Sequence, residues 1–205
     1  MEVVVVTLAL AGAGLYVVSV YNGIRTAATK VDEGWSGVAV QLKRRHDLVP
    51  VLVDAMRVAV RHDERMLDET LAARSAARTA LDGGDRGAVA VSEGILGAAL
   101  GRVMAVVEAY PDVKAIQAVV LLQRQLEEAE DQIAAARRLY NGNVQDYNRR
   151  LVTFPGSSIA SRIGARTAAF FELSAAEEAA VHVAPRIDDG TLAVRSGQLP
   201  PPDPA

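Results

Sequence analysis

The sequence predicts an all-α protein in which an N-terminal transmembrane helix is followed by an antiparallel bundle of long helices. Three observations predict this fold class. The first twenty residues are almost uncharged, aromatic residues make up only 4% of the chain, and apolar residues recur at spacings of three and four. Half of the 205 residues are hydrophobic, which is enough for one core. We therefore expect an anchor at 1–21, a bundle at 22–154, an amphipathic segment at 155–195 and a disordered tail at 196–205.

The N-terminal segment has the length and composition of a membrane span. Residues 3–20 carry no charged side chain, and as a helix they extend about 27 Å, close to a hydrocarbon core of about 30 Å. A cleaved signal peptide is the alternative, and it requires a basic region before the apolar run. Glu2 is the only charged side chain there, and the run continues past both Ala-x-Ala triplets. We therefore expect an uncleaved single span that contacts membrane lipid.

The basic residues near the span all follow it. Arg25 and Lys30 come first, then residues 43–45, and no basic side chain precedes the span. By the positive-inside rule, the N-terminus lies outside and the helical domain lies in the cytoplasm.

The chain after the span reads as long helices with defined interruptions. Residues 21–81 favour helix throughout, with a kink or a restart expected at Pro50. Residues 82–85 (Asp-Gly-Gly-Asp) predict a tight turn, with Asp85 capping the next helix. Beyond Pro50, apolar or small residues predict one packed face: Leu52, Ala55, Ala59, Met66, Ala73, Ala77 and Ala80.

Two further helices are predicted in the second half. The first covers about 86–109, with Val91, Ile95, Ala99, Val103 and Val106 on one side, and Pro111 and Asp112 separate it from the second. The second covers 113–154 and has the strongest periodicity of the chain, at Leu122, Leu126, Ala129, Ile133, Ala136, Tyr140, Val144, Tyr147, Leu151 and Phe154. Such spacing suits a bundle seam or a coiled coil. A homo-oligomer therefore stays open, because the partner helix can belong to a second copy.

The pattern weakens after Pro155. Arg162 and Arg166 stand among apolar residues such as Ile159 and Phe170, so a short helix here either packs back on the bundle or lies at the membrane interface. We favour packing back, because the apolar face is narrow. The proline-rich tail cannot form a core.

Composition and motifs exclude several function classes. There is no cysteine, and the net charge of −3 gives no basic footprint for nucleic acid. None of the three histidines stands in a Glu-x-x-His or a His-Glu-x-x-His pattern. We therefore expect no metal, no cofactor, no nucleic-acid partner and no enzymatic activity.

Three charged features allow two interpretations each. The acidic run at 127–131 is expected to pair locally with arginines of its own helix, rather than to bind a cation or a basic partner. The basic triplet at 43–45 is either a solvated helix face or a contact to anionic lipid. His62 is expected to be a satisfied histidine of a helix seam rather than a proton carrier.

Three long motifs carry a resemblance to a known family: VDEGWSGVAVQLKRRHDLVPVLV (31–53), AYPDVKA (109–115) and LQRQLEEAEDQIAAARRLYNGNVQDYN (122–148), followed by FPGSSIA. With these motifs the chain resembles the LemA family. The resemblance implies a bacterial cell-membrane protein with an N-terminal transmembrane helix, a long-helix bundle and no settled biochemical activity. His46 stands where the family usually has Tyr, and Gly34 also departs from its pattern.

The family motifs supply the candidate site residues. Trp35, Asp47, Tyr140, Asn141 and Tyr147 are predicted to form an interaction patch or a polar packing patch, with packing favoured. The predicted function is a non-enzymatic, membrane-anchored scaffold or adaptor that binds proteins, itself or lipid. The family's similarity to a magnetosome vesicle-formation protein and its link with membrane metallopeptidases imply two alternatives, a membrane-remodelling oligomer and a metallopeptidase accessory. An accessory with its own metal chemistry requires inward-facing carboxylates or histidines.

Overall fold

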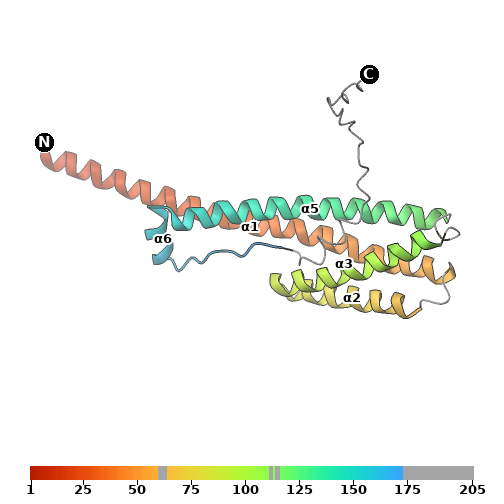
Figure 1. Ribbon diagram of the computed structural model, residues 1–205. Helices are drawn as coiled ribbons and strands as arrows, with labels where there is room; N and C mark the ends of the chain where they lie inside the picture. The colour runs from red at the N-terminus through yellow and green to blue at the C-terminus, as the bar shows by residue number, and fades with distance from the viewer. Residues whose placement is uncertain (60–63, 111–112, 114–115, 173–205) are drawn as a thin grey trace, which may run out of the picture.

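The computed structural model describes residues 1–59, 64–110, 113 and 116–172, and it contains α-helices and no strand within these ranges. The helices are α1 (Glu2–Ala59), α2 (Glu64–Gly83), α3 (Arg86–Ala109), α5 (Gln117–Val152) and α6 (Gly156–Arg162). Figure 1 shows α1, α2, α3 and α5 side by side as a bundle, from which the N-terminal part of α1 projects. The predicted all-α class is confirmed.

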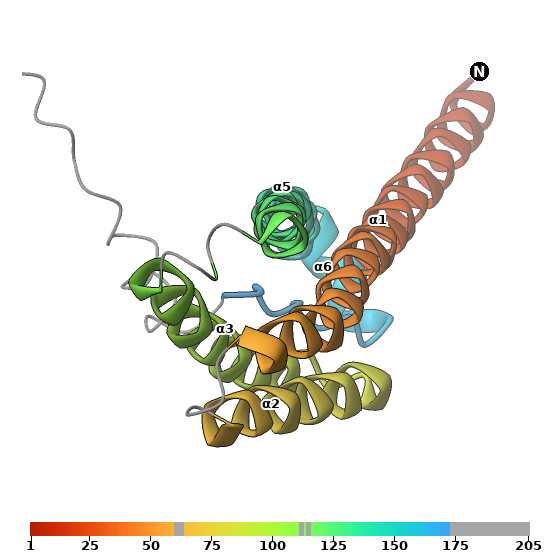
Figure 2. The same ribbon diagram turned by 90° about the vertical axis from the view of Figure 1, so that its right-hand side faces the viewer.

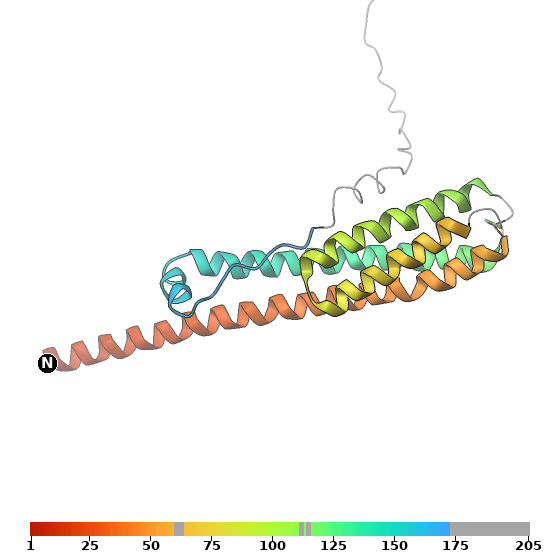
Figure 3. The same cartoon turned by 90° about the horizontal axis from the view of Figure 1, so that it is seen from below.

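Helix α1 is one continuous element of 58 residues, which extends about 87 Å. Every side chain from Met1 to Ser19 is exposed, and Val20 is the first that the bundle partly covers. Figure 3 shows this N-terminal part extending beyond the end of α5. The apolar segment therefore ends where contact with the bundle begins.

The restart predicted at Pro50 is wrong, because α1 runs through this residue to Ala59. The alternative, a kink within one helix, stays a prediction. Proline has no N–H to bond the carbonyl four residues earlier, which here belongs to His46. In the structure, Arg74 of α2 donates its Nε–H to the His46 carbonyl oxygen at 3.0 Å. A tertiary hydrogen bond thus replaces the missing helical one, and the backbone continues.

Helices α1 and α5 run antiparallel along most of the bundle (Figures 1 and 3). Residue numbers rise along α1 as they fall along α5: Gly34 lies against Tyr140, and Arg45 pairs with Glu130. A Cβ atom on Gly34 would lie 3.2 Å from the Cα of Tyr140. The glycine that departs from the family pattern therefore lets the two backbones approach closely.

Helices α2 and α3 form a hairpin around the turn that the sequence predicts. Gly84 has φ +77°, which an L side chain rarely adopts. Asp85 caps α3, because its Oδ1 accepts hydrogen bonds from the backbone N–H groups of Gly87 at 2.9 Å and Ala88 at 3.4 Å. Figure 2 shows the hairpin beside α1, with α2 and α5 on opposite sides of α1 and α3.

The packed face of α5 is confirmed, with seven predicted positions buried: Leu122, Leu126, Ala129, Ile133, Tyr140, Val144 and Leu151. Phe154 is wrong as a seam residue, because it lies beyond α5 and is 80% exposed. The predicted face of α3 is also wrong in part, since Val91 and Ile95 are 63% and 59% exposed. Helix α3 is apolar nearly all round, so periodicity alone does not fix which side faces inward.

The chain after α5 packs back on the bundle, as favoured. Helix α6 packs beside the C-terminal end of α5 and against α1 near Val20 and Ile24. Residues 165–172 then run extended along the bundle (Figure 3). Phe171 of this extended segment is buried, while Phe170 is half exposed. The predictions for His62, for Pro111 and Asp112, and for 173–205 fall outside the described residues.

Candidate functional site

Four of the five predicted patch residues lie together on α1 and α5. The ring of Trp35 packs edge-on against Tyr140, with centroids 5.7 Å apart, and against Phe171 at 5.2 Å. The guanidinium of Arg86 lies 5.2 Å from the Trp35 ring and 5.4 Å from the Tyr140 ring. Its Nη1 donates to the Tyr140 hydroxyl at 3.0 Å, and that hydroxyl donates to the Ala169 carbonyl at 2.8 Å. The aromatic patch thus has partners from four parts of the chain.

Two asparagines of α5 hold the extended segment by its backbone. The Asn141 amide accepts from the N–H of Phe171 at 2.9 Å and donates to the Phe171 carbonyl at 3.1 Å. Asn148 forms the same pair of bonds with Ala168, at 2.8 and 2.9 Å. The asparagines are seven residues apart, so they share one face of α5. Asn148, the second member of this pair, was not among the residues predicted from the sequence.

Tyr147 lies at the edge of the aromatic patch, whereas Asp47 lies away from it. Tyr147 is half-buried and contacts both the aromatic cluster and the small core beside α6. Asp47 does not belong to the patch: it is largely exposed and lies 3.9 Å from Arg74 and 3.8 Å from Arg78. Its carboxylate therefore sits beside the arginine that supports α1 at Pro50.

A buried charge cluster that was not predicted from the sequence lies between α1, α3 and α5. Arg45, His46 and Glu93 are each 0% exposed. Arg45 pairs with Glu93 and, through Nη1, with Glu130 at 2.6 Å. The Nε2 of His46 lies 2.6 Å from Glu93 Oε1. Both interpretations of Arg45 as a surface residue are therefore wrong.

Local pairing of the acidic run is wrong as well, because two of its members pair with α1. Glu130 bonds Arg45, and Glu128 lies 3.1 Å from Arg44. A sequence signal for the charge cluster does exist: Glu93 falls in register with the buried apolar stripe of α3, which is Val89, Leu96, Leu100, Val103 and Val107. A lone carboxylate in such a stripe requires a buried cation.

Electrostatics keep this cluster charged. Burial by itself raises the pKa of Glu93, but the hydrogen bond from His46 and the charge and hydrogen bonds of Arg45 outweigh it, so the net pKa lies below its usual value. Burial by itself lowers the pKa of Arg45, but the charges of Glu130 and Glu93 raise it above its usual value. Glu93 and Arg45 are therefore both ionised at neutral pH.

The charge cluster bears on metal chemistry. The inward-facing carboxylate and histidine that a metal-dependent accessory requires are present, but the Glu93 carboxylate bonds both His46 and Arg45. Among the described residues, no three His, Cys, Asp or Glu side chains are placed to hold a metal ion. The cluster's observed contacts are those of a structural ion network.

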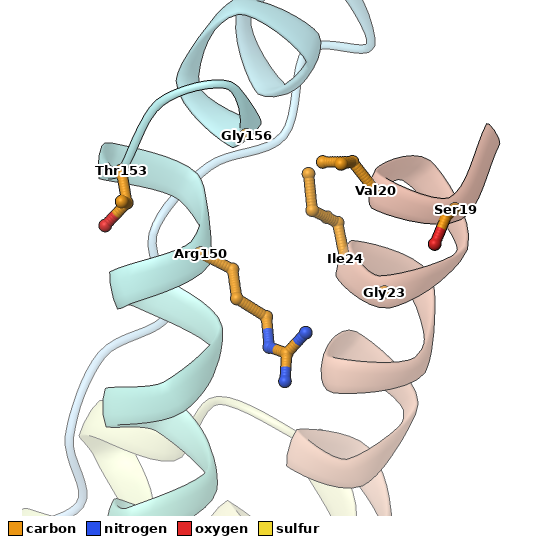
Figure 4. Close-up of a pocket in the computed structure, with 7 residues that line it drawn as sticks. All are labelled: Ser19, Val20, Gly23, Ile24, Arg150, Thr153 and Gly156. Atoms are coloured by element: carbon orange, nitrogen blue, oxygen red, sulfur yellow. The ribbon is translucent and has the colours of Figure 1, made fainter. Parts of the chain in front are cut away.

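A hollow of about 280 Å³ lies where α1, α5 and α6 meet. Figure 4 shows Arg150 of α5 reaching toward α1 near Gly23, with Ile24 and Val20 beside it. Arg150 donates its Nε–H to Asp146 at 2.9 Å, and this bond lowers the pKa of Asp146. The lining residues are Ser19, Val20, Gly23, Ile24, Arg150, Thr153 and Gly156. We call this space the junction hollow.

Within the described chain, two helices are long and apolar enough to cross a membrane. The apolar part of α1 is entirely exposed, whereas that of α3 is 39% buried within the bundle. An exposed apolar helix that continues into a helical bundle is the architecture of a membrane-associated protein. Residues 34–184 match the family model described as the LemA family, and the chain belongs to that family.

The chain is also similar to three magnetosome proteins. Magnetosome proteins MamQ 1 and MamQ 2 of Paramagnetospirillum magneticum (strain AMB-1) are each 36% identical over 81 residues, which is 40% of this chain and 30% of theirs. MamQ of Magnetospirillum gryphiswaldense is 33% identical over 90 residues, or 44% of this chain and 33% of that protein. The matched part thus spans about a third of the length of these relatives.

Proposed function

We propose that this chain is a non-enzymatic, membrane-anchored scaffold or adaptor whose bundle binds proteins, itself or lipid at the inner face of the bacterial cell membrane. One observation carries the proposal: α1 runs without interruption from its exposed apolar segment into the bundle. A rigid helix shared by anchor and bundle holds the bundle at a fixed place beside the membrane. That property suits a docking platform.

The proposed topology is a single span with the N-terminus outside and the bundle in the cytoplasm. It rests on the basic residues that follow the span, Arg25 and Lys30 first. Cysteines introduced singly at Glu2 and Arg78 would be the only thiols of this chain, because its sequence contains no cysteine. In intact cells an impermeant reagent should label Glu2→Cys and spare Arg78→Cys, whereas labelling of Arg78→Cys contradicts the topology.

Exposed aliphatic side chains on α1 and α5 offer a surface for a protein partner. Val40 and Val51 of α1 are 61% and 53% exposed, and Leu121 and Leu139 of α5 are 56% and 64% exposed. Each pair is separated by a whole number of helical turns, so its two members share a face. We call these four residues, one exposed pair on each helix, the aliphatic surface.

The test compares proteins recovered with the full-length chain from cross-linked native membranes. Val51→Asp with Leu121→Asp alters the aliphatic surface, and Val91→Asp is the matched control on α3, since Val91 is also exposed. We expect the surface variant, and not the control, to lose specific partners while the fluorescence of Trp35 is unchanged. Identical partners for the wild type and the surface variant contradict this surface. Trp35→Ala is no suitable probe, because that ring is partly buried and packs against the rings of Tyr140 and Phe171, so its loss would also disturb the fold.

A membrane-remodelling oligomer is the second candidate, and the similarity to the magnetosome proteins favours it. It requires copies of the chain to associate. Deformation of vesicles by the purified protein supports this candidate, whereas a strict monomer in both detergent and lipid contradicts it.

A further inference from the structure

The junction hollow lies at the boundary between the apolar helix and the bundle. Its α1 lining is Ser19, Val20, Gly23 and Ile24, which begins in the last turn of the apolar segment 3–20 and ends in the next turn. With α1 spanning a bilayer, this turn lies at the level of the lipid headgroups. The hollow therefore opens where phosphate groups are concentrated.

Arg150 gives this hollow a positive group. Its Nε bonds Asp146, while Nη1 and Nη2 have no hydrogen-bond acceptor in the part of the chain that the structure describes. A Cβ atom on Gly23 would lie 3.2 Å from Nη1, so the glycine leaves room for the guanidinium (Figure 4). Two adjacent N–H donors are suited to bind two oxygens of one phosphate.

The surroundings of the hollow are basic in an acidic protein. Residues 16–30 and 146–172 contain six basic and two acidic side chains, whereas the whole chain has a net charge of −3. Two apolar side chains at the same end, Val152 and Phe154, are 70% and 80% exposed. Basic groups beside exposed apolar side chains favour contact with an anionic membrane surface.

We propose that the junction hollow binds the headgroup phosphate of an anionic phospholipid, with Arg150 as its main contact. The inference rests on the membrane anchoring of the proposed function. A bound lipid would tie the α5–α6 corner to the bilayer, so that α1 and α5 are both attached to the membrane surface.

The test measures phosphatidylglycerol bound to the full-length protein in detergent by native mass spectrometry. Arg150→Gln removes the charge that lines the hollow. Arg149→Gln is the matched control, because Arg149 is the adjacent residue, also pairs with Asp146 and does not line the hollow. We expect Arg150→Gln to weaken phosphatidylglycerol binding at least about fivefold, and Arg149→Gln less than about twofold.

A second pair of variants tests the space rather than the charge. Gly23→Leu fills the hollow and should also weaken phosphatidylglycerol binding, whereas Gly37→Leu adds the same side chain to α1 where nothing lies within 4 Å. Circular dichroism and Trp35 fluorescence verify the fold of each variant. If Arg150→Gln does not fold, the Gly23→Leu and Gly37→Leu pair decides the question.

Each other outcome overturns the site. Equal losses in Arg149→Gln and Arg150→Gln show attraction by general charge, and equal binding of phosphatidylcholine shows that no anionic lipid is selected. Displacement of phosphatidylglycerol by equimolar inorganic phosphate shows a site for soluble phosphate. Alkaline carbonate extraction distinguishes failure of the membrane anchor from failure of the lipid site. A chain that is released from membranes contradicts the proposed function. A chain that is retained, but whose lipid binding does not depend on Arg150, contradicts this site alone.

Discussion

Replacing Glu93 by Gln keeps the size of the side chain and removes the negative charge that faces two fully buried neighbours, Arg45 and His46. Breaking a buried ion pair from one side costs about 3–5 kcal/mol, because the remaining charge stays buried without compensation. The glutamine side chain keeps one oxygen acceptor, and Glu130 still pairs with Arg45. We therefore expect the lower end, about 3 kcal/mol, or roughly a hundredfold larger unfolding constant.

Urea unfolding of the full-length protein in detergent measures this cost. The chain has one tryptophan, Trp35, whose ring packs against Tyr140 of the bundle, so its fluorescence reports unfolding of the bundle rather than of the apolar segment. Glu128→Gln is the matched control, because Glu128 also pairs with an arginine of α1 but is 56% exposed. An exposed pair contributes about 0–1 kcal/mol. Equal losses in Glu93→Gln and Glu128→Gln would show that burial adds nothing to the cost and would contradict the prediction.

Acidification gives an independent check on the same carboxylate. The pKa of Glu93 is lowered in the folded protein, so its ionised form contributes stability above the unfolded pKa of about 4.3. This contribution is lost as the pH falls through the folded pKa. The difference in unfolding free energy between wild type and Glu93→Gln should therefore narrow below about pH 4.3, and a difference that stays constant throughout acidification contradicts the ionised cluster.

Three further substitutions test other contacts. Asn141→Ala removes two hydrogen bonds to the backbone of Phe171. The attachment of the extended segment should weaken by about 1–3 kcal/mol, so the Phe171 amide should exchange with solvent at least about tenfold faster. An unchanged exchange rate contradicts the role of this side chain. Asp85→Ala removes the cap of α3 and should lower stability by about 1 kcal/mol, or the thermal midpoint by about 2–4 °C; an unchanged midpoint contradicts it. Arg74→Met keeps an unbranched side chain but removes the donor to the His46 carbonyl. The free energy of unfolding should fall by about 1–3 kcal/mol, and amide exchange in α1 beside Pro50 should become faster. Amide exchange as slow as in the wild type contradicts the role of Arg74 at Pro50.

Features that depend on neighbouring residues were predictable from the sequence. The turn at 82–85 depends on a glycine with positive φ and an aspartate that caps the next helix, and both act within a few residues. The packed face of α5 follows from spacing along a single helix. The exposed N-terminal part of α1 follows from a long segment without charge.

Features that depend on distant contacts were not predictable in the same way. Pro50 predicts a kink or a restart of the helix, because proline lacks the N–H that would bond the His46 carbonyl. The hydrogen bond that replaces the missing one comes from Arg74, 28 residues from that carbonyl. Arg45 stands in a basic triplet, which predicts an exposed helix face. It is buried because the packing of α3 brings Glu93 beside it, and this contact is not visible in the sequence. The two asparagine contacts use the backbone of the extended segment, so that segment's side chains carry no signal of them.

The candidate patch was predicted correctly in the placement of four of its residues and wrongly in that of the fifth. Trp35, Tyr140, Asn141 and Tyr147 lie together, because they share the facing sides of the antiparallel helices α1 and α5. Asp47 lies apart, since it faces α2. Family motifs therefore identified residues with specific contacts, but they did not separate those contacts into one group around the aromatic rings and another beside Pro50.

The proposed function depends most on one property of α1, its unbroken course from the lipid into the bundle with the boundary near Val20. Nitroxide labels on single cysteines along α1, in full-length protein reconstituted into lipid vesicles, test it through collision with oxygen and with a water-soluble nickel chelate. We predict that Leu10→Cys is accessible to oxygen and shielded from nickel, that Ser36→Cys is accessible to nickel, and that the reversal falls between residues 19 and 25 with helical periodicity beyond it. Accessibility of Leu10→Cys to nickel, or a loss of helical periodicity near Val20, would contradict this course.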